Sequence, residues 1–216
     1  MERVIVLGVL ASGGGTNLQA ILDAVAAGSL HARVAVVISN VPGAGALARA
    51  RDAGVETLVI DHKSFGDRGT FDTAVVEALR SRGVELVVLA GFMRVVTAVL
   101  LDAFPWRVIN IHPALLPAFP GVHGQAQALR YGVRVAGCTV HFVDGGTDTG
   151  PIIAQAAVPV LEGDDEASLS ARILVKEHEL LPQVLQWIAE GRVQVDSSAT
   201  GLGRARVHVR AAPPAG

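Results

Sequence analysis

VIVLGVLASGGGTNLQAILDAVAAG, residues 4–28, joins an apolar run to a glycine-rich loop and then to a helical pattern that Gly28 ends. The Val, Ile and Leu residues at 4–10 predict a buried strand. Similar apolar runs follow at 34–39, 56–60 and 86–90, with helical patterns between them at 44–53 and 70–82, which end at Gly54 and Gly83. Alternation of strands and helices with almost continuous apolar strands predicts a parallel sheet that helices cover on both faces.

The second half of the chain departs from this alternation. Its apolar runs lie at 108–111, 137–143 and 152–158 and predict three strands. The last two strands have no room for a crossover helix between them, which predicts antiparallel pairing. Residues 164–190 predict a long closing helix that Pro182 kinks or breaks. We therefore expect one α/β domain over residues 1–195, with a mostly parallel twisted sheet and antiparallel strands in its C-terminal half. For residues 196–216 we expect a poorly ordered tail.

Composition limits the class of protein. The chain has 216 residues, of which 50% are hydrophobic, enough for the core of one domain without disulfides or metals. A formal net charge of -2 gives no broad basic surface, so nucleic acid is not an expected partner. Cys138 is the single cysteine, which excludes an intramolecular disulfide and favours a cytoplasmic protein. No apolar run reaches the length of a membrane span.

The glycine-rich loop ASGGGTNLQA, residues 11–20, leads into a helix that Thr16 or Asn17 could cap. Backbone amides at a helix N-terminus bind phosphate, and glycine lets the ligand approach closely. A Walker A loop is excluded because Gly14 stands where the lysine belongs, and a dinucleotide fingerprint because Leu18 replaces its third glycine. The loop therefore predicts a monophosphate site; the alternative is a tight turn without a ligand.

The stretch NIHPALLPAFPG, residues 110–121, follows an apolar run and places Asn110 and His112 at a strand end. Residues two apart share one face of a strand, and the prolines that follow stiffen the loop. An amide and an imidazole at such a place favour catalysis. The alternative is an ordinary strand-to-helix connection with a solvated histidine.

A second glycine-rich loop, DGGTDTGP at residues 144–151, contains Asp144 and Asp148 between two predicted strands. If Asp148 faces His112, it favours and orients a charged imidazolium, which gives a general acid or a stabiliser of an oxyanion. Aspartate in such a loop more commonly caps its own turn.

Four motifs together resemble the folate-dependent formyltransferase family, and within it the glycinamide ribonucleotide formyltransferases. They are SGGGTNLQ, VLAGFMR, NIHPALLP and DGGTDTGPII, in that order, and the resemblance covers residues 4–195. It implies a Rossmann-like formyltransferase fold, 10-formyltetrahydrofolate as co-substrate and no metal. It also implies an activity: transfer of the formyl group from N10 to the glycine amine of glycinamide ribonucleotide, in purine biosynthesis.

The same resemblance implies roles for individual residues. Asn110 and a protonated His112 would stabilise the tetrahedral oxyanion, and Asp148 would keep His112 charged. The residues that match phosphate and ribose contacts are Gly15, Thr16, Asn17, Lys176 and Glu177. Those that match folate contacts are Arg68, Met93, Arg94, Val95, Val96, Asn110 and Asp144, and the matching supporting histidines are His123 and His141.

Several of these positions have a plainer interpretation. Lys176 and Glu177 could be an exposed pair on a solvated helix face, Met93 and Val96 could be core residues, and both supporting histidines could be structural. Gln125 also departs from relatives that carry a second histidine near it, so the loop is expected only to position other groups.

Within the family, methionyl-tRNA formyltransferase has a further C-terminal domain and formyltetrahydrofolate hydrolase an N-terminal regulatory one. Chain length and the phosphate loop favour the ribonucleotide enzyme, with small-molecule substrates, as a monomer or homodimer. From another class, a nucleotide-binding sensor would explain the glycine loop but would leave Asn110, His112 and Asp148 without a purpose.

Overall fold

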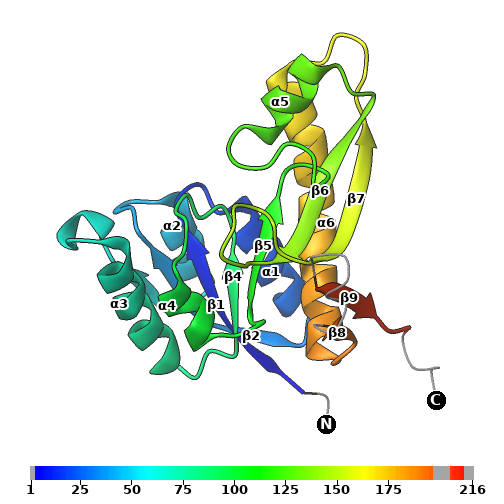
Figure 1. The fold of residues 1–216 in the computed structure, drawn as a ribbon. Coiled ribbons are helices and arrows are strands. Elements are labelled where there is room, and N and C mark those ends of the chain that lie inside the picture. The colour runs from blue at the N-terminus through cyan, green and yellow to red at the C-terminus, as the bar shows by residue number, and fades with distance from the viewer. Residues whose placement is uncertain (1–2, 197–204, 212–216) are drawn as a thin grey trace.

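The computed structural model describes residues 3–196 and 205–211, with a seven-stranded sheet at its centre (Figure 1). The sheet has the order β3-β2-β1-β4-β5-β6-β7. Its strands are Ile5–Ala11 (β1), Ala32–Ser39 (β2), Thr57–Val59 (β3), Leu86–Leu89 (β4), Val108–His112 (β5), Val135–Phe142 (β6) and Ile152–Pro159 (β7). The helices are Thr16–Ala26 (α1), Gly45–Asp52 (α2), Arg68–Arg80 (α3), Ala98–Ala103 (α4), Gly124–Tyr131 (α5) and Glu166–Ala189 (α6), with a short 3-10 helix, His62–Ser64 (η1).

Strand directions confirm the expected mixed sheet. The strands from β3 to β5 pair in parallel, and β5, β6 and β7 pair antiparallel. The register between β5 and β6 sets Asn110 opposite His141 and His112 opposite Thr139. This register brings polar side chains from both strands into one place.

Helices cover both faces of the sheet, as predicted. On one face, α1 and α6 contribute fully buried residues such as Leu18, Ile21 and Leu181 to the larger core cluster. On the other face, α3 and α4 contribute Phe71 and Leu100 to a second cluster. Figure 1 shows α3 and α4 on one side of the sheet, with the long α6 behind β6 and β7.

The structure confirms the three glycine signals at helix C-termini but not the predicted N-cap of α1. Gly28, Gly54 and Gly83 follow their helices with φ of 71°, 70° and 66°, the left-handed conformation that glycine adopts at a helix end. The predicted cap of α1 is wrong. Its N-cap is Gly15, and Thr16 and Asn17 are the first residues of the helix itself.

Helix α6 does not break at Pro182 and runs for 24 residues through it. Asp165 and Ser168 form a capping box at its start. Leu181 and Leu185, on either side of the proline, are fully buried, and this packing offsets the one helical hydrogen bond that a proline removes.

The end of the chain also differs from the expectation. Val193–Asp196 (β8) and Arg206–Val209 (β9) pair as a two-stranded antiparallel sheet, so the predicted tail contains an ordered strand. Val193, Val195 and Val207 pack against the main core, and this burial explains the ordering. The rest of the predicted tail, at 197–204 and 212–216, lies outside the described residues. In the described part of the chain, no helix is long and apolar enough to cross a membrane.

Candidate active site

His112, at the end of β5, lies between two oxygen acceptors. Its Nδ1 is 3.4 Å from Asp148 Oδ2, and its Nε2 donates to the Phe119 carbonyl oxygen at 2.9 Å. The side chain is only 5% exposed. Each ring nitrogen thus faces an oxygen, and a ring with protons on both nitrogens satisfies both acceptors.

Asn110 and His141 form a second pair beside it. His141 is buried; its Nδ1 donates to the Phe142 carbonyl oxygen at 2.8 Å, which leaves Nε2 to accept from Asn110 Nδ2 at 3.2 Å. His141 Nε2 also lies 3.6 Å from Asp148 Oδ1. His141 therefore orients the Asn110 amide and lies in the same cluster as Asp148.

The loop between β6 and β7 brings Asp148 to both histidines. Asp148 Oδ2 also accepts from the Gly121 amide at 2.7 Å. Burial raises the pKa of Asp148, but the hydrogen bond from the Gly121 amide and the nearby His141 and His112 rings outweigh it, so the pKa lies below its usual value. The group is therefore a carboxylate at neutral pH.

Asp144, and not Asp148, caps the turn of this loop. Asp144 Oδ1 accepts from the Gly146 amide at 3.0 Å and from the Thr149 hydroxyl at 2.6 Å, which closes the loop. A folate contact by Asp144 stays a prediction.

The glycine-rich loop after β1 has a geometry that only glycine allows. Gly15 has a φ of 75°, and a Cβ built on it would lie 2.6 Å from Ala46 Cα in α2. The first amides of α1, at Thr16 and Asn17, precede the first helical hydrogen bond, in which Gln19 N donates to Gly15 O. Amides in this position form a site for a phosphate group.

Glu177 in α6 is buried beside this loop. The residue is 6% exposed, and its Oε2 accepts from Asn17 Nδ2 at 2.8 Å. Burial raises the pKa of Glu177, and the bond from Asn17 acts in the opposite direction. Within the described part of the chain, no donor pairs with the buried Asn17 Oδ1. The interpretation of Glu177 as a solvated surface residue is therefore wrong.

Lys176 differs from its neighbour. Its Nζ donates to Glu179 Oε2 at 2.7 Å on the surface of α6, where the Lys176 side chain is 41% exposed. Lys176 is thus part of a solvated charge pair, but its partner is Glu179 and not Glu177. A phosphate contact by Lys176 stays a prediction.

The segment after β4, predicted to contact folate, mixes exposed and buried residues. Met93 is 74% exposed and Val95 53%, whereas Val96 lies in the core. The core interpretation is therefore wrong for Met93 and right for Val96. The Arg94 guanidinium lies 4.7 Å from the centre of the Phe71 ring. Arg68 is the exposed first residue of α3.

Ser12 and Asp72 bind the two ends of the 93–97 segment, and the sequence analysis selected neither as a site residue. Ser12 Oγ accepts from the Met93 amide at 2.9 Å. The buried Asp72 accepts from both the amide and the hydroxyl of Thr97, at 2.6 and 2.7 Å. A polar residue within the apolar face of a predicted helix was the only signal for Asp72.

His123 lies at the surface. It is the N-cap of α5, with a φ of 60°, and its Nδ1 lies 3.7 Å from Glu166 Oε1. Its side chain is 73% exposed, and a supporting role for His123 stays a prediction.

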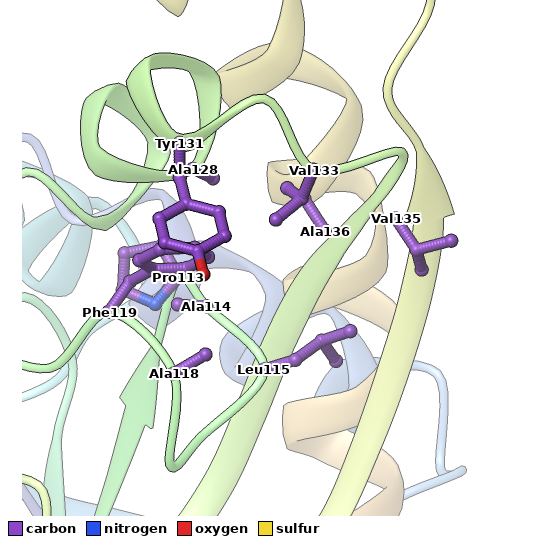
Figure 2. Close-up of a pocket in the computed structure, with 10 residues that line it drawn as sticks. All are labelled: Pro113, Ala114, Leu115, Ala118, Phe119, Ala128, Tyr131, Val133, Val135 and Ala136. Carbon is purple, nitrogen blue, oxygen red and sulfur yellow. The ribbon is translucent and has the colours of Figure 1, made fainter.

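An apolar cavity of about 480 Å³ lies between α5, the start of β6 and the proline-containing loop (Figure 2). Tyr131 and Phe119 meet there edge to face, with ring centres 5.8 Å apart. Tyr131 is the only titratable residue in its lining, which does not include Asn110, His112 or Asp148. Among the described residues, no group of three or more His, Cys, Asp or Glu side chains is placed to hold a metal ion.

Comparison with known proteins agrees with this fold. The model of the formyl transferase family matches residues 3–185. The chain belongs to the formyl transferase family. Phosphoribosylglycinamide formyltransferase of Escherichia coli is 40% identical over 208 residues, which are 96% of each chain. A solved structure of glycinamide ribonucleotide transformylase 1 from Symbiobacterium toebii is 53% identical, with a TM-score of 0.93 over 98% of this chain and 96% of that one.

Longer relatives also match. The trifunctional purine biosynthetic protein adenosine-3 of Drosophila melanogaster is 50% identical over 185 residues, which are 85% of this chain. The chain spans only 14% of the length of that relative. The likeness therefore concerns one part of a much longer protein.

Proposed function

We propose that this protein transfers the formyl group of 10-formyltetrahydrofolate to the glycine amine of glycinamide ribonucleotide. The products are formylglycinamide ribonucleotide and tetrahydrofolate. The observation that carries the proposal is the meeting of Asn110, His112 and Asp148, with a phosphate-type glycine loop in the same domain. The names of the full-length relatives support the same acceptor.

In the proposed reaction, the free amine attacks the formyl carbon, and an oxyanion forms as the new C–N bond closes. The second amide hydrogen of Asn110 and the positive charge of His112 stabilise that oxyanion. The amine then gives up a proton, N10 receives one, and the bond between the formyl carbon and N10 breaks. A water molecule relays this proton, because the acceptors around His112 already hold both ring protons in place.

His112 can also donate directly to the oxyanion, but only after a change of partner. Its Nε2 proton now binds the Phe119 carbonyl oxygen. Direct donation requires the oxyanion to replace that carbonyl, with a shift of the loop that contains Phe119. The Asp148 carboxylate holds the other nitrogen in either arrangement.

The ribonucleotide fits the groups around α1. We assign its phosphate to the amides of Gly15, Thr16 and Asn17, and its ribose hydroxyls to Glu177 and the unpaired Asn17 Oδ1. Folate is assigned to the exposed Met93 and Val95 with Arg94 and Asp144, and to Arg68. A cytoplasmic location and a monomeric or dimeric state stay predictions.

The test is formyl transfer by the purified protein, with and without glycinamide ribonucleotide. The folate can be 10-formyltetrahydrofolate or a 5,8-dideazafolate analogue, whose deformylation is followed by absorbance. Release that depends on the ribonucleotide supports the transferase. Release without it indicates a hydrolase, and no release from a folded protein that binds the ribonucleotide indicates a sensor.

A further inference from the structure

Helix α2 holds the glycine-rich loop from outside the site. Arg49, in the last turn of α2, donates from Nε to the Gly14 carbonyl oxygen at 2.8 Å. At the other end of the helix, the Ala46 amide donates to the Gly13 carbonyl oxygen at 3.0 Å. Two successive carbonyls of the loop thus have partners in α2.

The bond from Arg49 determines the direction of an amide in the loop. In a planar trans peptide, the C=O of one residue and the N–H of the next point in opposite directions. When Arg49 holds Gly14 O on the α2 side, the Gly15 N–H must point away from α2. Gly15 is the N-cap of α1 and belongs to the group of amides assigned to the phosphate.

Arg49 also contacts α1 itself. Its Nη1 donates to Gln19 Oε1 at 3.2 Å, and Gln19 Nε2 donates to Asp23 Oδ1 at 2.8 Å. The guanidinium therefore joins the loop to the first turns of the helix that follows it. A planar fork with several donors can bind both partners at once, which an ammonium group cannot do in the same geometry.

The Arg49 side chain lines a cavity of about 490 Å³ together with Thr16, Gln19 and His178. Burial lowers the pKa of His178, and the charge of Arg49 lowers it further against the opposing effect of Asp23. His178 is therefore neutral at pH 7, and Arg49 is the cation on this side of the loop.

We propose that Arg49 is a positioning residue for the ribonucleotide phosphate. It fixes the peptide between Gly14 and Gly15 so that the Gly15 amide faces the phosphate, and it takes no part in the reaction at the formyl carbon. The inference rests on the proposed function, because it concerns the phosphate of that substrate.

The test uses Arg49→Met and Arg49→Lys, with Arg51→Met as the matched control. Arg51 is exposed on the same helix. For Arg49→Met we expect KM for the ribonucleotide to rise by about ten- to a hundredfold, the usual effect of losing hydrogen bonds from a charged group. We expect kcat and KM for the folate to stay within about twofold, and Arg51→Met to resemble the wild type.

Arg49→Lys separates geometry from charge. The lysine keeps the positive charge but cannot bind Gly14 O and Gln19 Oε1 together, so we expect most of the rise in KM to remain. Inhibition by ribose 5-phosphate should weaken in parallel, whereas binding of the nucleoside without phosphate should not change. Gln19→Leu, which removes one partner of Arg49, should give a smaller rise and serves if Arg49→Met does not fold.

Three results would overturn the proposal: wild-type KM in Arg49→Lys, an equal rise in KM for both substrates, or an equal effect of Arg51→Met. Failure of the proposed function is a separate result. If the wild type transfers no formyl group, the ribose 5-phosphate measurement still compares Arg49 and Arg51 variants directly.

Discussion

Asp148 Oδ2 lies 3.4 Å from His112 Nδ1, and the two residues come from segments that are distant in the chain. Asp148 has a φ of 53°, in the left-handed region that aspartate tolerates better than larger side chains do. The Gly121 amide holds the same carboxylate oxygen. The imidazole ring is thus oriented from one side by Asp148 and from the other by the Phe119 carbonyl.

Replacing Asp148 by asparagine should remove turnover and leave binding. Asparagine can still accept from Gly121 but cannot balance a charged His112. We expect kcat for formyl transfer to fall by at least about 10²-fold, with little change in the dissociation constant of the ribonucleotide by calorimetry. Asp102→Asn, at an exposed position in α4, is the control; a parallel loss of binding and fold would show a structural aspartate instead.

The lowered pKa of Asp148 predicts how the stability difference between wild type and Asp148→Asn depends on pH. The pKa of Asp148 is lowered from 3.8, so the folded protein binds fewer protons at this site than the unfolded chain does. Its contribution to stability is therefore full above pH 3.8 and is lost as the pH falls through the lower folded value. Denaturant unfolding at several pH values should show the gap between wild type and Asp148→Asn shrinking only in acid. A gap that shrinks near pH 6 would contradict this assignment.

Gly15→Ala and Gly13→Ala should differ sharply in stability. The new Cβ at Gly15 meets Ala46 at 2.6 Å in a left-handed backbone, whereas at Gly13 it meets no atom of the described residues within 4 Å. Left-handed backbone alone costs about 1–2 kcal/mol, which lowers Tm by about 2–4 °C per kcal/mol in a chain of this size. Calorimetry should find that loss, or more, only in Gly15→Ala; equal Tm values would contradict the described loop.

Glu177→Gln should stabilise the free protein and weaken ribonucleotide binding. Burial raises the pKa of Glu177 above 4.5, so the folded state disfavours the charged form, and stability falls as the pH rises from 4.5 through the folded pKa. Glutamine can keep the acceptor for Asn17 without that charge. We expect a higher Tm at pH 7, a difference that disappears below pH 4.5, and a higher KM for the ribonucleotide. A lower Tm at pH 7 would show that the carboxylate has a compensating partner.

Asp72→Asn should act on the folate side. It replaces an acceptor of two hydrogen bonds from Thr97 at the end of the 93–97 segment. We expect KM for 10-formyltetrahydrofolate to rise by about tenfold, with KM for the ribonucleotide unchanged. Thr97→Val removes only the hydroxyl bond and should give a smaller effect. Thr73→Val, on the exposed side of the same helix as Asp72, should have none.

Local patterns predicted most of the elements, including the short α2 and β3, but missed the helices α4 and α5. Helix α4 has six residues and α5 eight, and both lie in segments where proline, glycine or exposed apolar residues obscure the helical period. The continuous helix through Pro182 was missed because the burial of its neighbours, which a local pattern does not record, outweighs one lost hydrogen bond.

The sequence by itself predicted most of the strands and helices, a phosphate-type loop before α1, and the placement of Asn110 and His112 on one face of a strand. These features depend on neighbours within a few residues. Only the tertiary structure decided that Asp148 meets His112, that Glu177 is buried against Asn17, and that Arg49 holds Gly14. Each of those contacts joins segments far apart in the chain, so it exists only once the sheet and its helices have packed together.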